Sequence, residues 1–251
     1  MKKAGFAKLL ALARVEWRLR QQSTFLGFLW TMLNPALLFA VMYAVFEHSF
    51  GSRQSDYAMF LVIGIVEWNF FSSATNCALT SLQRRAPIIK NYPVSPETVV
   101  LASLLSVYFS HLLELAALGT LVLLFGASPS LSWLWLAPLD ILYLCLVAGT
   151  GMLLAWLGVF YFDIERIWAI ALMAGFFLTP IFYPLDVVNE VKRRLLEFSP
   201  LTAAVESLRL IFSGAPPSHE ALLCLAFWAV PALIAGFTAL RLARAKIGDA
   251  L

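Results

Sequence analysis

Three ionisable side chains, Glu67, His111 and Glu114, lie inside long apolar runs of the sequence. His111 and Glu114 are three positions apart, so they would share one face of a helix. Glu67 and Glu114 lie about ten and about eleven residues from the expected outer ends of their runs, which gives them a common depth at about 1.5 Å per residue. Ionisable groups inside a membrane are costly and often mark function. The pattern fits a polar patch that lines a conduit or relays protons. It also fits neighbouring helices on which one imidazole and one carboxylate neutralise each other.

Aromatic residues form a second set with usable chemistry. Three of them recur at helical spacing in the first apolar run, and others crowd the end of the fifth. Aromatic rings stack on the weakly apolar faces of sugars without fixing one register, so a row of them would let a glycan slide. Lipid contact or packing between helices explains the same pattern. The conduit candidates are Phe39, Tyr43, Phe46, Phe177, Phe182 and Tyr183.

Several catalytic motifs are missing from the sequence. It has no G-x-x-x-x-G-K-[ST] phosphate loop and no Gly-Lys pair, so the chain is not expected to hydrolyse ATP by itself. His111 is followed by Leu-Leu-Glu, which does not make the H-E-x-x-H motif of a zinc protease, and no G-x-S-x-G occurs. The three cysteines form no C-x-x-C pair and are expected to act as small hydrophobic residues. No metal site is expected.

Composition predicts the elements that must position these residues. Of 251 residues, 61% are hydrophobic and 13% are charged, whereas soluble domains carry roughly 25% charged residues. A helix needs about 20 apolar residues to cross the hydrocarbon core of a membrane, and the apolar runs reach that length. We therefore expect an all-α, polytopic membrane protein that forms one transmembrane domain over residues 1–251. Six transmembrane helices are expected, at residues 27–46, 57–80, 98–125, 133–160, 167–183 and 221–242.

The distribution of lysine and arginine predicts the orientation. With the N-terminus inside, the inner segments (2–20, 84–90, 166 and 241–246) hold thirteen of these residues and the outer segments hold five. The positive-inside rule then places both termini in the cytoplasm. The basic residues flank apolar runs and form no stripe on a folded domain, so nucleic-acid binding is not expected. The five outer basic residues are Arg53, Lys192, Arg193, Arg194 and Arg209.

Three segments outside the six runs carry further information. Residues 4–22 have an apolar stripe at helical spacing with basic residues beside it, which predicts an amphipathic helix at the membrane surface. Residues 83–97 are too polar to cross and contain three prolines. Residues 184–219 form a long outer connection with two helix-like stretches, 187–198 and 202–212. Both stretches are too short to span, so we expect helices that rest in the outer interface or enter it part-way.

Four stretches, taken in order, resemble one protein family. Residues 14–46 are similar to the entry of type-2 ABC-export permeases, and residues 88–105 to the cytoplasmic loop that leads into their third span. Residues 179–184 resemble the outer end of the family's fifth span, and residues 198–212 the Asn-Pro region that follows. The resemblance covers nearly the whole chain, and the subgroup concerned exports O-antigen, capsule or teichoic acid polysaccharides. The first stretch supplies Ser23, Leu26-Gly27, Leu29-Trp30 and Asn34-Pro35.

The resemblance implies a homodimer of this chain with two separate ATP-binding cassette ATPase subunits. Those subunits would bind ATP and magnesium, and this chain would bind no cofactor. It also implies a lipid-linked glycan as substrate, moved from the cytoplasmic to the outer face of the bacterial cytoplasmic membrane. Residues 83–97 are then the expected ATPase-coupling loop, stiffened by its prolines, with the 4–22 helix beside it. The expected coupling residues are Arg14, Arg18, Arg84, Arg85, Lys90, Pro93, Pro96 and Glu97.

Two other classes of function remain open at this point. A proton-coupled secondary transporter could use Glu67, His111 and Glu114, although the sequence lacks the inverted repeat that such folds often show. A membrane-embedded glycan enzyme would need acidic residues at the outer face. Candidates for that role show no recognisable catalytic arrangement: Asp186, Glu190 and Glu197.

Overall fold

A computed structural model describes residues 2–22, 29–51, 56–124 and 129–250 of the chain. The expectations that concern Ser23, Leu26, Gly27, Arg53 and the end of the third run at Phe125 fall outside these residues. The described chain is helical throughout, which confirms the all-α class. Its elements are α1 (Lys2–Gln22), α2 (Leu29–Phe50), α3 (Tyr57–Arg84), α4 (Ala86–Asn91), α5 (Pro96–Leu124), η1 (Leu131–Trp135), α6 (Leu136–Phe160), α7 (Ile164–Leu178), η2 (Leu185–Val187), α8 (Glu190–Glu197), α9 (Pro200–Phe212), α10 (His219–Leu242) and α11 (Arg244–Ala250).

Five helices of the described chain are long and apolar enough to cross a membrane. They are α2, α3, α5, the continuous pair η1–α6, and α10. The fifth predicted run gives α7, which has 15 residues and is about 22 Å long, less than the roughly 30 Å of the hydrocarbon core. It ends at Leu178 because Pro180 follows Thr179, and the residue before a proline is driven out of the helical region. Thr179 has an extended backbone, with ψ of 136°.

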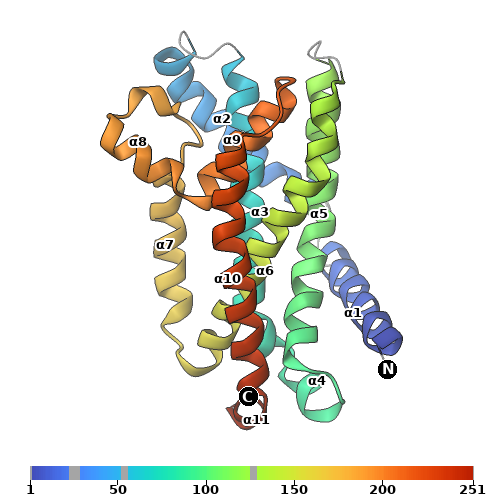
Figure 1. Ribbon diagram of the computed structural model, residues 1–251. Helices are drawn as coiled ribbons and strands as arrows, with labels where there is room; N and C mark the ends of the chain where they lie inside the picture. The colour runs from blue at the N-terminus through green and yellow to red at the C-terminus, as the bar shows by residue number, and fades with distance from the viewer. Residues whose placement is uncertain (1, 23–28, 52–55, 125–128, 251) are drawn as a thin grey trace.

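The central helix of the bundle is α3, which packs against α2, α5, α6, α7 and α9. Figure 1 shows α3, α5, α6 and α10 running side by side, with α4 and α11 at one end and α8 and α9 towards the other. Most of the buried apolar side chains of the molecule belong to this group of helices. The residues singled out in the apolar runs therefore sit on packed helices, which hold them at fixed depths.

The closest helix–helix approach joins α6 to α10. A Cβ added to Gly149 would collide with the backbone of Ala232 and Leu233, and one added to Gly236 would lie 2.6 Å from the Gly149 carbonyl oxygen. Glycines at such a contact let two backbones approach, because side chains would hold them apart. This contact fixes α10 against the bundle although α10 contains Pro231.

The long connection at residues 184–219 folds as expected into two short helices, α8 and α9. Asn189 begins α8, and its side chain accepts a hydrogen bond from the Lys192 amide at 3.0 Å. Pro200 occupies the first turn of α9, where its fixed φ suits a helix start. Of the two, α9 is the buried helix and packs against α3, α6 and α10, whereas α8 lies at the periphery beyond α7 (Figure 1).

Candidate functional site

An intramembrane polar cluster joins α3, α5 and α6. The His111 Nε2 atom lies 3.9 Å from Glu67 Oε1 and 3.4 Å from Asp140 Oδ1. His111 is 1% exposed, and the Phe70 ring stacks on it with centroids 4.0 Å apart. The expected proximity of Glu67 and His111 is thus present, and a second carboxylate, Asp140, shares the same imidazole.

Asp140 is a member of the cluster that our reading of the sequence missed. The Tyr108 hydroxyl donates a hydrogen bond to Asp140 Oδ2, and the Tyr143 hydroxyl donates to the backbone oxygen of Glu67 at 3.1 Å. The signal was available, because Asp140 is the single acidic or basic residue between positions 129 and 160. A lone carboxylate in so apolar a run points to a partner on another helix.

Glu114 has different surroundings from His111, one helical turn away. Its Oε2 atom accepts a hydrogen bond from Asn69 Nδ2 at 3.5 Å, and its side chain lines a cavity. His111 faces α3 and α6 in the interior of the bundle. The single polar face expected on α5 therefore serves two purposes: His111 joins three helices, and Glu114 lies at the wall of the cavity.

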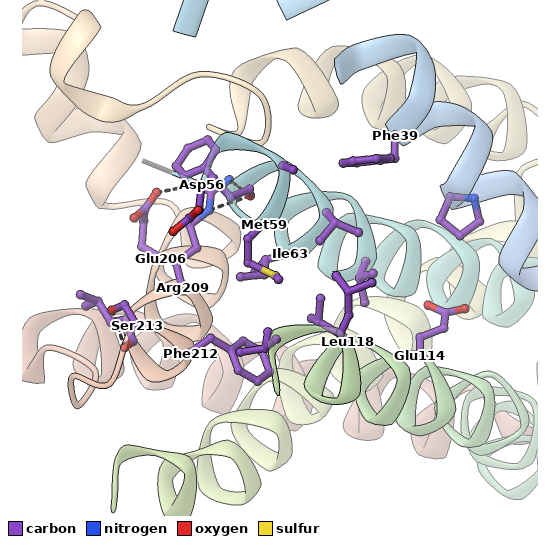
Figure 2. A pocket seen from close by; sticks show the side chains of 18 of the residues that line it. Phe39, Asp56, Met59, Ile63, Glu114, Leu118, Glu206, Arg209, Phe212 and Ser213 are labelled. Atoms are coloured by element: carbon purple, nitrogen blue, oxygen red, sulfur yellow. Dashed lines mark hydrogen bonds and ion pairs between the residues drawn. The ribbon is translucent and has the colours of Figure 1, made fainter. Parts of the chain in front are cut away.

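The cavity has a volume of about 1140 Å³ and lies among α2, α3, α5, α9 and the segment after α7. Figure 2 shows Phe39 on α2 projecting towards it, opposite Leu118 and Glu114 on α5. Most of its wall is apolar and comes from α3 and α5. Four carboxylates and one guanidinium also line it: Asp56, Glu114, Asp186, Glu206 and Arg209.

Arg209 ties α9 to the start of α3 and to the segment after α7. It is 9% exposed, and its guanidinium lies 3.3 Å from the centroid of the Phe60 ring. It donates to the backbone oxygens of Phe60 at 2.9 Å, Pro180 at 2.8 Å and Ile181 at 2.9 Å, and to Glu206 Oε1 at 2.7 Å. The positive-inside count treated Arg209 as an ordinary outer charge, so this role was missed.

All six conduit candidates belong to one aromatic cluster. Rings of α2 meet rings that follow α7: Phe46 and Phe182 have centroids 4.8 Å apart. Tyr57, at the start of α3, joins the two sets, because its hydroxyl donates to the Phe182 backbone oxygen at 2.7 Å and its ring lies 6.2 Å from that of Tyr43. The remaining pairs are Phe39–Tyr43, Phe177–Phe182 and Phe182–Tyr183, at 5.6, 6.0 and 5.1 Å.

The aromatic face of α2 therefore packs partly within its own chain. Phe39, Tyr43 and Phe46 are half-buried, whereas Phe177 is 56% exposed. Tyr57 went unnoticed in the sequence because it follows a loop and belongs to another helix. Packing within the chain accounts for these ring contacts.

Two ion pairs tie α1 and α11, near the two ends of the chain, to the predicted coupling loop. Glu16 of α1 contacts Arg85, with Oε1 2.5 Å from Nε, and this hydrogen bond raises the pKa of the Arg85 guanidinium above its usual value. Arg244 of α11 binds Glu97 through both carboxylate oxygens, at 3.0 and 3.2 Å from Nε and 3.0 Å from Nη2. The N-terminal helix thus lies beside the loop.

The predicted coupling residues fall into two groups. Pro96 and Glu97 are buried, with Glu97 3% exposed, so they cannot form part of a docking surface, and Arg85 is half-buried behind Glu16. Arg244, which the sequence did not single out, is the partner of Glu97. The exposed group consists of Arg14, Arg18, Arg84, Lys90 and Pro93.

Residues 7–213 match the family described as ABC-2 type transporter. The chain belongs to the ABC-2 type transporter family. Similar proteins include an O-antigen export system permease protein, RfbA, of Klebsiella pneumoniae, 26% identical over 93% of this chain and 90% of that protein. The RfbA of Myxococcus xanthus is 26% identical over 87% and 85% of the two chains. The polysialic acid transport protein KpsM of Escherichia coli is 23% identical over 73% and 72%.

As an ABC-2 permease, the chain is a multi-pass membrane subunit that works with a separate ATP-binding cassette ATPase. Transmembrane subunits of this family have no ATPase activity and carry no cofactor. Among the described residues, no group of three or more His, Cys, Asp or Glu side chains could hold a metal ion. Family membership therefore removes the secondary transporter and the glycan enzyme as alternatives.

Proposed function

We propose that this chain is the permease of an ATP-driven exporter that moves a lipid-linked polysaccharide, of the O-antigen or capsule kind, from the cytoplasmic to the outer face of a bacterial inner membrane. The observation that carries the proposal is the match to O-antigen permeases of two genera, which extends over at least 85% of this chain and of each partner. A polysaccharide transporter of a third genus also matches. Shared descent along almost the entire chain favours a shared class of cargo.

In this proposal the chain crosses the membrane six times, with both termini in the cytoplasm. The positive-inside count of thirteen to five favours that orientation. The crossing that is added to the five long helices is α7 together with residues 179–184. Figure 1 shows α7 running from the end of α6 towards α8. The helix supplies about 22 Å of the roughly 30 Å core, and residues 179–184, which turn at the end of α7, supply the remainder. The non-helical part is allowed because Arg209 satisfies its carbonyls.

The proposed assembly is a homodimer with two ATPase subunits, and α4 supplies the contact with the ATPase. Three exposed residues around α4 support this choice, Arg84, Lys90 and Pro93, and α1 adds Arg14 and Arg18 nearby. The ion pairs of Arg85 and Glu97 hold the loop to both ends of the chain. Movement of the ATPase would reach α3 and α5 directly, since α4 lies between them.

The glycan path in this proposal follows the aromatic cluster. Tyr43 and Phe46 would present their exposed edges to the sugar, near the copy of α2 in the second protomer, whereas Phe39 projects towards the cavity (Figure 2). Phe177, Phe182 and Tyr183 would meet it near the outer face. Each stacked contact contributes about 0.5–1.5 kcal/mol, which is weak enough to break repeatedly as a chain slides.

Deletion of the chain's gene and complementation test the proposal. Loss of surface polysaccharide, with the lipid-linked glycan retained inside, is the expected phenotype. Charge reversal by Arg84→Glu with Lys90→Glu should weaken co-purification of the ATPase, whereas Lys192→Glu, an exposed basic residue of α8 at the other end of the bundle (Figure 1), should not. Normal surface glycan in the deletion strain would rule the proposal out.

A further inference from the structure

The cavity among α2, α3, α5 and α9 is charged at one end and apolar along the rest of its wall, which matches the head group and chain of a lipid in the outer leaflet. Three of its charged residues, Asp56, Glu206 and Arg209, lie together at one end of the cavity, and Glu114 lies apart from them on α5 (Figure 2). A fourth carboxylate, Asp186, comes from the segment after α7. The apolar wall of the cavity continues from the charged end along α3, through Met59 and Ile63 to Val66. Ten residues of helix cover about 15 Å, which is half of the roughly 30 Å hydrocarbon core.

The cavity opens to the side of the bundle. Ala36 of α2, and Ala117 and Leu121 of α5, all line it and are exposed. An apolar space that opens towards lipid fills with hydrocarbon, because water gains no polar partners there. The wall therefore favours a hydrocarbon chain over a sugar, which would need more hydrogen-bond partners than Glu114 at the inner end provides.

The charges at the mouth select the head group. Three carboxylates face one guanidinium in this outer region, and Arg209 already donates to three backbone oxygens and to Glu206. Arg209 thus has little capacity left for a phosphate, and the remaining acidic side chains, Asp56 and Asp186, repel net negative charge. Like charges held close together cost energy, and an opposite charge between them removes that cost.

We propose that this cavity binds a hydrocarbon chain of an outer-leaflet phospholipid whose head group carries an ammonium. The occupant is a lipid of the surrounding membrane. The phosphate-linked carrier of the exported glycan is disfavoured there, because its anionic group would meet the acidic mouth. The proposal rests on the orientation in the proposed function, in which α8 and α9 are at the outer face.

Photolabelling tests the site in the permease–ATPase complex in nanodiscs of phosphatidylglycerol. Two trace probes with the same photoreactive chain end are compared, one a phosphatidylethanolamine and one a phosphatidylglycerol. Adducts of the first should map to residues 59–66 and 114–122. Ala117→Trp fills the space and should lower them about tenfold, or about 1.4 kcal/mol. Ala116→Trp, an exposed neighbour outside the cavity, should not.

A charge variant tests the mouth without changing the wall. Asp186→Lys should remove the preference for phosphatidylethanolamine over phosphatidylglycerol, whereas Glu220→Lys, an exposed outer carboxylate outside the cavity, should keep it. Adducts spread evenly over α2, α7 and α10, or labelling that is unchanged in Ala117→Trp, would overturn the proposal. Competition by a polyprenyl phosphate at least as strong as competition by phosphatidylethanolamine would also overturn it. So would labelling of the isolated permease that is lost in the complex, because protein would then cover the cavity.

The labelling requires no glycan, so its outcome is separate from that of the export assay. Failure of export complementation with successful labelling would reject the proposed function and keep the lipid site. The orientation is checked independently with Ser213→Cys, at the edge of the cavity, which should react with a membrane-impermeant thiol reagent added outside intact cells. Reaction only after the cells are opened would reject the outer-leaflet assignment.

Discussion

At the scale of single residues, His111 is the side chain at which three helices bring ionisable groups together inside the membrane. It lies between Glu67 of α3 and Asp140 of α6, and both carboxylates are shielded from water by packed helices. An imidazole between two carboxyl groups gives each of them a polar neighbour from another helix. This geometry favours the interpretation that the cluster holds helices together, and nothing in it requires a conduit.

Replacing His111 with Leu should therefore destabilise the bundle. Removal of one partner from a buried polar contact costs about 1–3 kcal/mol, because the remaining polar group is left buried without that partner. We expect a lower unfolding temperature and less assembled complex, with partial recovery when Asp140→Asn is added. The exposed His219→Leu is the control. Full stability of His111→Leu together with impaired export would instead place His111 on the transport path.

Tyr43 is the residue at which the glycan path is best tested. Its ring touches Phe39 and Tyr57, and one stacked contact corresponds to about 0.5–1.5 kcal/mol. Tyr43→Ala should lower export about two- to tenfold while the complex and its basal ATP turnover survive, and Tyr43→Phe should retain most export. Surface glycan and ATP turnover are the measurements. An equal loss in the Phe variant would point to the hydroxyl and against stacking.

At the scale of elements, the coupling loop is held at both of its ends. Arg244 of α11 reaches Glu97 in the first turn of α5, and Glu16 of α1 reaches Arg85 at the end of α3. Polar, proline-rich loops usually lie in water, which is why burial of Pro96 and Glu97 could not be foreseen. Arg244 was unpredictable for a related reason: its partner lies 147 positions away, and no local spacing links the two.

Breaking the Glu97–Arg244 pair should separate ATP use from transport. Glu97→Gln removes the buried charge, so the chain should fold and still bind the ATPase, but each glycan exported should consume more ATP. The double exchange Glu97→Arg with Arg244→Glu should restore the ratio in part. ATP hydrolysis and export are measured together in proteoliposomes. A ratio unchanged in Glu97→Gln would show that the pair has no part in coupling.

The α6–α10 contact offers a stability test that is independent of function. Gly149→Leu places a side chain where the backbone of α10 lies, and overpacking costs about 1–3 kcal/mol or more. We expect a lower unfolding temperature by fluorescence-detected size exclusion. Gly119→Leu is the matched control, since a Cβ there lies 3.8 Å from Trp133 and meets no backbone. Equal loss in both variants would mean that α6 and α10 are not in close contact.

At the scale of the whole molecule, apolar runs predict the long helices well and irregular backbone poorly. The run predicted at 57–80 is the helix Tyr57–Arg84, and the run at 221–242 is His219–Leu242, because some 20 apolar residues in lipid have few alternatives to a helix. The fifth run was predicted to extend to 183, but Pro180 ends the helix at Leu178. Tertiary contacts such as those of Arg209 and Asp140 leave no periodic trace in the sequence, so the site emerged only with the fold.

Cysteine accessibility decides the number of crossings. Asp163→Cys, just before α7, should react with an impermeant reagent only in opened cells, and Asn189→Cys, before α8, should react in intact cells. The two positions flank the short helix and both are exposed. Reaction of both from the same side would show that α7 does not cross.

During synthesis, the non-helical backbone after α7 is made before Arg209, the residue whose side chain satisfies its carbonyl oxygens. Arg209 follows Pro180 by 29 positions, and its guanidinium donates to the Pro180 and Ile181 oxygens. Without a donor, each such oxygen would cost several kcal/mol in hydrocarbon. In the proposed six-span topology, we therefore expect a nascent chain that has not reached Arg209 to keep the end of α7 at the membrane surface or in the insertion channel, and α7 to enter the bilayer together with α9.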